Sequence, residues 1–120
     1  MLEFAPSRMA AFAVIDGFAN LPPAWGGPDT VLPSVDTRAA AKALLMGLPS
    51  SIAPPHLSPS ADGEIGFTWA TAAKRVDALL DADGHLVWFW ADHDGRINPG
   101  GEVTYDGAFP DDLLVVLESP

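Results

Sequence analysis

The sequence has no cysteine among its 120 residues, which excludes disulfide frameworks, thiolate nucleophiles and cysteine-based zinc sites. It also has no stretch that approaches the ~20 apolar residues of a membrane-spanning helix. The early apolar run Met9–Ile15 is preceded by Glu3 and closed by Asp16, so we expect no secretory signal peptide. These absences favour a reducing compartment, and the cytoplasm is the expected location.

Basic residues are scarce: six Lys and Arg stand against sixteen Asp and Glu, which gives a formal net charge of −10. A surface of this sign repels phosphate backbones, which argues against nucleic-acid binding. The same charge attracts a basic protein partner, or serves only to keep a small protein dispersed in solution. The length predicts one domain, residues 1–120, because domains commonly have about 100–150 residues.

Motifs for catalysis and cofactor binding are also missing. No serine lies in a G-x-S-x-G elbow, no histidine pair has metal-binding spacing, and neither pair of adjacent glycines precedes a helix in a nucleotide-binding pattern. The Asp-x-Asp-Gly segments at 81–84 and 92–95 lack the spacing of an EF-hand loop. We therefore expect no catalytic residue, no metal site and no cofactor.

Proline and glycine divide the N-terminal half into two predicted helices. The first covers residues 6–20, with Ser7 as its candidate N-cap. The second follows Ser34, a good N-cap, and stops at Gly47. One face of this second helix carries four apolar residues at helical spacing: Ala41, Leu44, Leu45 and Leu48. The Pro- and Ser-rich residues 49–62 are interpreted as a semi-extended connector.

Four Asp-Gly pairs, beginning at residues 62, 83, 94 and 106, mark the turns of an antiparallel meander. Asp-Gly favours hairpin turns because glycine adopts positive φ without steric cost. The predicted strands lie near 64–69, 75–81, 85–91 and 102–105, and a short helix follows Pro110. The fold class predicted is therefore α+β: two N-terminal helices, a four-stranded antiparallel β-meander and a short C-terminal helix.

Two finer features of the meander follow from the same residues. The segments 81–86 and 92–97 repeat one pattern and predict two turns that are built alike. The run Pro99-Gly100-Gly101 predicts a bulge or a loose edge before the last strand.

The third predicted strand is apolar on both faces. Trp88 and Trp90 share one face, and Val87 and Phe89 share the other. Such a strand is typical of a sheet that is covered on both sides, or of a sheet whose second face is a contact surface. Aromatic residues are favoured binding anchors, so we expect an aromatic patch rimmed by carboxylates to bind the partner, with the tryptophans packing in the core as the alternative. The predicted partner-binding residues are Trp69, Trp88, Trp90, Asp81, Asp83, Asp92 and Asp94.

Several short motifs follow one another in a set order between residues 21 and 90. They are a Leu-Pro-x-x-Trp-x-Gly loop, a Pro-Ser helix start with a Leu-Pro end, a Pro-rich connector and a Pro-Ser-x-Asp-Gly-x-Ile-x-x-x-Trp strand. The residues concerned are Leu21, Pro22, Trp25, Gly27, Pro33, Ser34, Leu48, Pro49, Pro54, Pro55, Pro59, Ser60, Asp62, Gly63, Ile65, Trp69, Asp83 and Gly84. In this order the chain resembles a family of small uncharacterised bacterial proteins. The resemblance implies a small intracellular bacterial protein, of the size of antitoxins and other accessory proteins, and assigns no functional residue.

These observations favour a non-enzymatic acidic protein that binds, and thereby inhibits, a basic protein partner, as an antitoxin, an immunity protein or an anti-CRISPR-like factor does. The alternative is a small-ligand-binding domain or minor enzyme with a pocket between helices and sheet, in which His56 or His85 is the polar group. A homodimer through the third or fourth predicted strand would also cover the aromatic residues.

Overall fold

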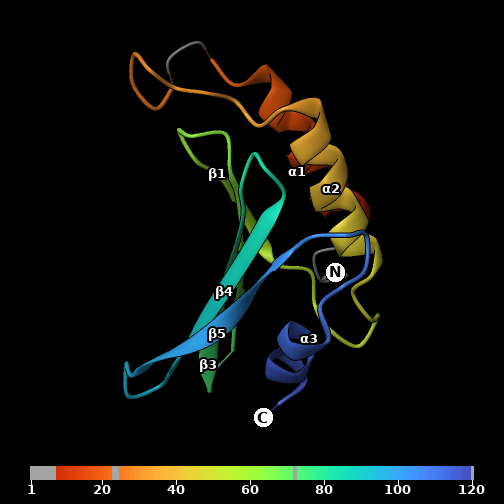
Figure 1. The fold of residues 1–120 in the computed structure, drawn as a ribbon, viewed down its shortest axis with the longest axis vertical. Coiled ribbons are helices and arrows are strands. Elements are labelled where there is room, and N and C mark those ends of the chain that lie inside the picture. Colours follow the sequence, from red (N-terminus) through yellow and green to blue (C-terminus); the bar gives the residue numbers. More distant parts are fainter. Residues whose placement is uncertain (1–7, 23–24, 72, 120) are drawn as a thin grey trace, which may run out of the picture.

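The computed structural model describes residues 8–22, 25–71 and 73–119, in which three α-helices lie on one side of a five-stranded antiparallel sheet (Figure 1). The α+β class is confirmed. The elements in chain order are α1 (Arg8–Gly17), a 3-10 turn (Phe18–Asn20), α2 (Val35–Met46), β1 (His56–Pro59), β2 (Ile65–Ala70), β3 (Lys74–Leu80), β4 (His85–Asp92), β5 (Ile97–Thr104) and α3 (Asp111–Glu118).

The two N-terminal helices form where the sequence predicts them. The Ser34 side chain accepts a hydrogen bond of 3.1 Å from the backbone N–H of Thr37, which confirms Ser34 as the N-cap of α2. The first helix changes to a 3-10 turn at Phe18, directly after Gly17, which is a poor helix former. The N-cap proposed at Ser7 lies outside the described residues.

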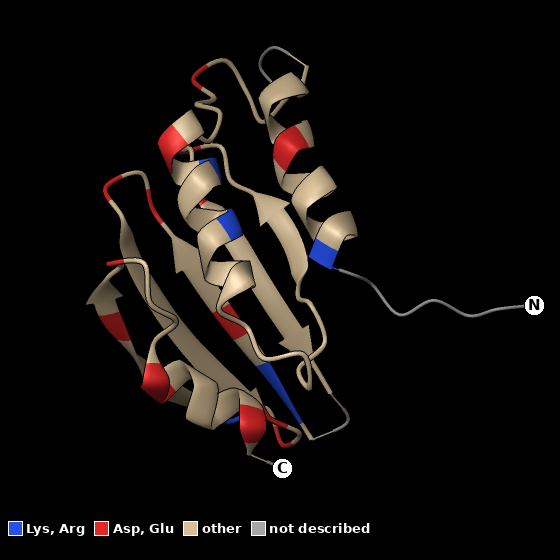
Figure 2. Ribbon diagram, turned by 90° about the vertical axis from the view of Figure 1, so that its right-hand side faces the viewer, with Lys and Arg blue, Asp and Glu red and all other residues tan. Residues whose placement is uncertain are grey.

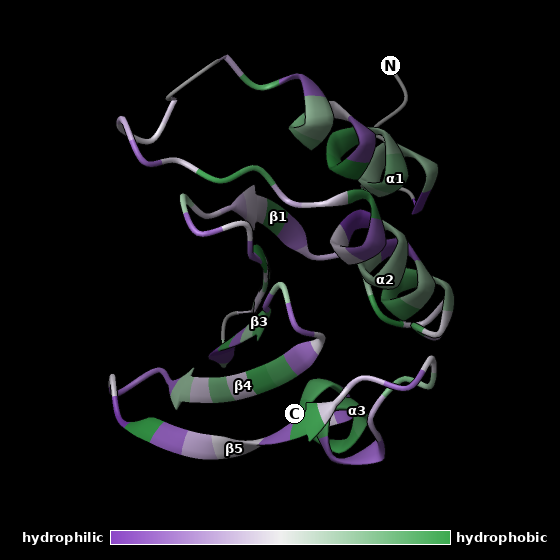
Figure 3. Cartoon of the chain, turned by 45° about the horizontal axis from the view of Figure 1, so that its top comes forward, coloured by the Kyte–Doolittle hydropathy of each residue, from purple (hydrophilic) through white to green (hydrophobic). Residues whose placement is uncertain are grey.

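The meander is confirmed, since the strands pair in the order β1-β2-β3-β4-β5. The glycines of all four Asp-Gly pairs have positive φ, between 79° and 102°. The left-handed region is open to glycine because it lacks a Cβ atom. Three of the pairs turn the chain between paired strands as predicted, at β1–β2, β3–β4 and β4–β5. The pair at 106 is not a hairpin turn, because it leads from β5 to α3, and the turn from β2 to β3 has no Asp-Gly pair. β4 is hydrophobic over much of its length, whereas its neighbour β5 has hydrophilic stretches (Figure 3).

The prediction of four strands is wrong, because the connector contributes a fifth, β1. Its four residues pair with β2, from His56 opposite Thr68 to Pro59 opposite Ile65. Leu57 is buried in the core, and this burial holds the short strand in place. Proline tolerates such a position because β1 is an edge strand and needs hydrogen-bond donors on one side only.

The last strand is longer than predicted and includes the expected bulge. The register shifts between Trp88 and Phe89, whose partners are Gly101 and Pro99. The intervening Gly100 lies so close to β4 that a Cβ atom there would be 2.4 Å from the Trp88 carbonyl oxygen. Only glycine fits at this point, which explains the bulge physically.

The core lies between the helices and one face of the sheet. α1 packs against α2 and β1, α2 packs against β2, and α3 packs against β5. Fully buried side chains from both layers meet there, among them Ile15, Leu45, Phe67, Leu86 and Leu113. Among the described residues, no helix combines the length and the apolar character needed to cross a bilayer.

Candidate interaction surface

The strand register determines which side chains share a face of the sheet. Directly paired residues point to the same side, and side chains alternate along each strand. Trp88 pairs with Ala78 and Ala78 with Phe67, so these three belong to the helix-covered face. Phe89 pairs with Asp77 and with Pro99, which places it on the opposite face.

The tryptophans predicted to bind a partner belong to the covered face. Trp88 is 2% exposed and Trp69 is 7% exposed, and both lie in the core cluster. Trp90 is half-buried and packs against that cluster. The predicted aromatic contact patch is therefore corrected: these indoles pack under the helices, because their cross-strand neighbours are the apolar side chains that the helices cover.

In the part of the chain that the structure describes, no helix covers the other side of the sheet, which we call the open face (Figures 1 and 2). Its apolar part runs over β4 and β5, where Val87, Phe89 and Ile97 are 39%, 42% and 69% exposed. We define the open face by the residues of β2 to β5 that point away from the helices: Gly66, Thr68, Ala70, Arg75, Asp77, Leu79, His85, Val87, Phe89, Ala91, Ile97, Pro99, Glu102 and Thr104.

The signal that locates the open face is present in the sequence. The Asp83-Gly84 turn sets the register of its hairpin, and this register places Phe89 beside Asp77. A face that carries a charged residue on the neighbouring strand is the solvent side of an antiparallel sheet. When the faces are followed across strands, and not along β4 alone, Phe89 is the aromatic residue expected on the exposed face, and Trp88 is not.

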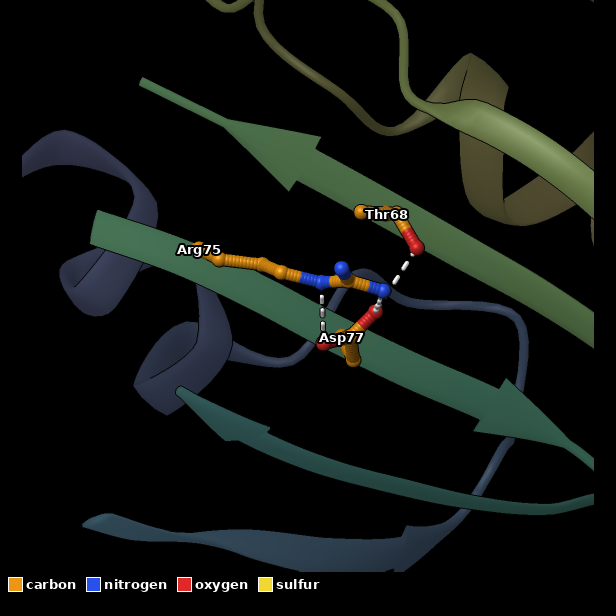
Figure 4. A network of polar contacts seen from close by, with 3 residues as sticks. All are labelled: Thr68, Arg75 and Asp77. Atoms are coloured by element: carbon orange, nitrogen blue, oxygen red, sulfur yellow. Dashed lines mark hydrogen bonds and ion pairs between the residues drawn. The ribbon is translucent and has the colours of Figure 1, made fainter. Parts of the chain in front are cut away.

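A polar network crosses the open face next to its apolar part (Figure 4). The Thr68 hydroxyl donates a 2.7 Å hydrogen bond to Oδ1 of Asp77, and Nε of Arg75 donates one of 2.9 Å to Oδ2. A second Arg75 nitrogen reaches Asp77 Oδ1 at 3.3 Å. The network holds the guanidinium in one orientation, which makes its exposed edge a preorganised donor.

The four predicted aspartates occupy two turns of the same design. Asp81 Oδ1 accepts from the backbone N–H groups of Asp83 and His85, each at 2.9 Å. Asp92 Oδ1 accepts from Asp94 and Arg96 in the same way, at 3.0 and 3.1 Å. This confirms the prediction of two like turns, and it shows that Asp81 and Asp92 also have a structural role.

The two acidic turns lie at opposite ends of β4. The eight residues of β4 separate them by roughly 25 Å, at about 3.3 Å per residue. The backbone N–H of His85 is the main cause that lowers the pKa of Asp81 below its ordinary value, so this carboxylate stays ionised in mild acid. The open face is thus flanked by negative charge at both ends.

The acidic end near α2 has no metal-binding geometry. A hollow of about 240 Å³ there is lined in part by Asp36, Asp81 and Asp83. Among the described residues, however, no three His, Asp or Glu side chains are grouped closely enough to hold a metal ion.

Basic residues concentrate away from the open face. Arg8, Arg38 and Lys42 lie on α1 and α2 (Figure 2), and Lys42 forms an ion pair with Asp16 of the neighbouring helix. On the open face itself, the Arg75 guanidinium is paired with Asp77. Arg96 is exposed in the turn that holds Asp92 and Asp94, where two carboxylates outnumber it, so the charge that a partner meets at both ends of this face is negative.

A pocket of about 390 Å³ lies beside the end of β2, and it concerns the small-ligand alternative. Its lining includes His56 at the start of β1, Trp69 from β2, Lys74 from β3 and Leu117 from α3. His85, the other histidine considered for such a pocket, lies elsewhere, next to Asp81 at the far end of β3.

Comparison with known proteins adds no identification: no family model, no curated protein and no solved structure matches this chain.

Proposed function

We propose that this protein is a non-enzymatic, acidic interaction protein that binds a basic protein partner through the open face, and that it acts by inhibiting that partner, as an antitoxin, immunity or anti-defence protein does. The observation that carries the proposal is the exposure of Val87, Phe89 and Ile97 together on a helix-free sheet face. Acidic turns flank this face at both ends.

The apolar part of the open face has the composition of the centre of a protein interface. Phe89 lies beside Pro99, and Ala91 lies beside Ile97 on the adjacent strand. Contiguous exposed apolar residues with a polar surround are typical of protein-binding sites, where an aromatic residue near the centre commonly contributes most of the affinity. Phe89 takes the role of anchor in this proposal, in place of the buried Trp88.

The net charge favours a basic protein over a second copy of this chain as the partner of the open face. A second copy of this chain would bring another net charge of −10 against the first, and like charges oppose such an approach. A basic partner gains from the same field, which speeds its encounter and orients it. Asp83, Asp94 and Glu102 supply exposed carboxylates around the apolar part, while Asp81 and Asp92 contribute charge from within the turns.

The experiment compares capture by three forms of the protein. Tagged wild type, the double variant Val87→Ser/Phe89→Ser and the control Val35→Ser are exposed to a lysate of the host. Val35 is 67% exposed, on α2 and hence on the helix side, so its variant removes a still more accessible apolar side chain from the other surface. The captured protein is then purified and titrated against each form.

We expect the double variant to weaken binding at least tenfold, since truncation of an interface anchor costs about 2 kcal/mol or more. The Val35 control should bind like wild type, and raising the salt from 50 to 300 mM should weaken binding by wild type. Equal affinity of all three folded forms, or a partner that is itself acidic, would rule out the open face as the binding site.

A further inference from the structure

The pocket beside the end of β2 results from where β1 begins. Pro54 and Pro55 have no backbone N–H and cannot continue a strand ladder, so the pairing of β1 with β2 starts only at His56 opposite Thr68. Residues 69–71 extend past that point without a strand partner on this side among the described residues. The space left there is closed by the turn around Ile52 and by the end of α3.

The walls of this pocket are largely apolar, and its polar side chains are Lys74, His56 and the hydroxyls of Ser51, Thr68 and Thr71. Ile52, Val76, Leu117 and the indole of Trp69 provide apolar surface. No Asp or Glu is among the lining residues, although the chain has sixteen acidic residues. Lys74 provides the only formal positive charge in the lining. In a protein of net charge −10, this is a local site for an anion.

The position of Lys74 is determined by α3. Its ammonium donates to the backbone carbonyl oxygens of Val116 and Ser119, near the C-terminal end of that helix. An ammonium has three protons, so one remains for a ligand. Desolvation lowers the pKa of Lys74 below its ordinary value, and a carboxylate beside it would favour the charged form again.

Trp69 contributes aromatic surface. Its side chain lines the pocket, and its indole Nε1 is buried with no hydrogen-bond partner among the described residues. Because this N–H is closed to solvent, the indole serves the pocket as an apolar wall, and its N–H resonance reports on binding nearby.

We propose that this pocket binds a small molecule with an apolar body and a single carboxylate group, with Lys74 as the partner of the carboxylate. The volume of about 390 Å³ lies within the range of small-molecule sites. This pocket adjoins the open face at Thr68, but none of the apolar residues that carry the open-face proposal, Val87, Phe89 and Ile97, lines it.

The test uses 3-phenylpropanoate and its neutral counterpart 3-phenylpropan-1-ol, titrated into ¹⁵N-labelled protein and followed by NMR. We expect the acid to shift the indole N–H resonance of Trp69 and the amides of Ala53 and Thr71. The acid should bind about fivefold to tenfold more tightly than the alcohol, which corresponds to one partly exposed ion pair of about 1 kcal/mol.

Four variants separate charge from shape. Lys74→Met should remove the preference for the acid over the alcohol, while Lys74→Arg should keep it. Lys42→Met, which deletes the same charge on α2, should leave both affinities unchanged. Ala53→Trp places a bulky group in the exposed lining and should weaken the binding of acid and alcohol alike.

The proposal is overturned if neither probe shifts the Trp69 indole resonance at 10 mM, or if wild type binds acid and alcohol equally. It is also overturned if Lys42→Met abolishes the preference as fully as Lys74→Met does, since the effect would then come from net charge alone. Lys74→Met could unfold because α3 loses its hydrogen bonds to the ammonium. In that case, the affinities of the two probes for wild type and for Lys74→Arg still test the proposal.

Discussion

At the scale of single residues, two buried polar atoms have no hydrogen-bond partner among the described residues: Trp69 Nε1 and the Tyr105 hydroxyl. The first belongs to a buried tryptophan whose side chain lines the pocket at Lys74. The second belongs to a half-buried tyrosine that packs against the core. Burial of an unpaired hydroxyl destabilises the folded state. Removal of the hydroxyl oxygen of Tyr105 should therefore not lower the free energy of unfolding.

We predict that Tyr105→Phe leaves the free energy of unfolding unchanged or raises it by about 1 kcal/mol, because the desolvation cost of the hydroxyl disappears while the ring packing stays. Urea denaturation followed by tryptophan fluorescence measures this. A loss of more than 1 kcal/mol would mean that the hydroxyl has a partner that stabilises the fold.

A direct titration also tests the burial of the Tyr105 hydroxyl, because Tyr105 is the only tyrosine in the chain. Desolvation first, and the nearby Asp106 carboxylate second, raise the pKa of Tyr105 above 10.0. Tyrosinate absorbance should therefore appear at higher pH in the folded protein than in urea. Since the folded-state pKa is the higher one, the stability of wild type falls as pH rises above about 10, whereas Tyr105→Phe lacks this loss.

At the scale of elements, the turns β3–β4 and β4–β5 repeat one hydrogen-bond pattern around Asp81 and Asp92. In both turns an aspartate stands three residues before the glycine, and its carboxylate accepts from backbone N–H groups that have no backbone acceptor in the tight turn. These side chains stabilise the hairpins whether or not a partner is bound.

We predict that Asp81→Ala lowers the free energy of unfolding at pH 7 by about 1 kcal/mol, because two backbone N–H groups lose their acceptor. Asp81→Asn should cost less, since its carbonyl oxygen can accept the same bonds. Chemical denaturation measures both, and Asp83→Asn in the same turn is the matched control because the Asp83 side chain accepts neither of these bonds.

The pH dependence of this turn has a defined sign. The folded-state pKa of Asp81 is lowered, so its contribution is fully present above the unfolded-state pKa of about 3.9 and is lost as pH falls toward the folded-state value. Wild type should therefore lose more stability than Asp81→Asn between pH 5 and pH 2. Equal losses in the two proteins would show that the carboxylate charge does not matter in the turn.

At the scale of the whole molecule, two opposing forces act on the open face. Its exposed apolar residues favour association, while the net charge of −10 opposes association between copies. Salt screens the second force but not the first. Binding to a basic partner and self-association therefore respond to salt in opposite directions.

We predict that the purified protein is monomeric at 50 mM salt and self-associates more strongly at 500 mM, and that Phe89→Ser reduces this self-association. Sedimentation equilibrium at several concentrations measures it, with Val35→Ser as the control. A tight dimer at low salt that Phe89→Ser disrupts would identify the open face as a homodimer interface, and would contradict the partner-binding proposal.

Much of the local structure could be predicted because its signals act over a few residues. Ser34 starts α2 through its own side chain, and the Asp-Gly pairs turn the chain through glycine φ angles. The strand at 56–59 was missed because its three flanking or internal prolines disfavour strands locally. That strand exists because Leu57 is buried between α1 and the sheet, which is a contact between distant parts of the chain.

The candidate site was less predictable than the fold. Alternation along β4 divides its side chains into two sets, but both sets are apolar, so the pattern within this strand does not say which set is covered. Trp88 and Trp90 are the larger residues, and their size alone favours the prediction that they are binding anchors. Their burial follows from the register with Val76 and Ala78, whose strand carries Arg75 and Asp77 on its other face, and from the side on which the helices pack.

The sequence by itself determined the turns, the N-cap of α2, the alternation of the strands and the excess of negative charge, because each of these depends on neighbouring residues or on composition alone. The tertiary structure decided that all three helices pack on one side of the sheet (Figure 1). That choice buries Trp69 and Trp88, leaves Phe89 and Ile97 exposed, and encloses the pocket at Lys74. It rests on packing between elements far apart in the chain, where the burial of apolar area outweighs local preference.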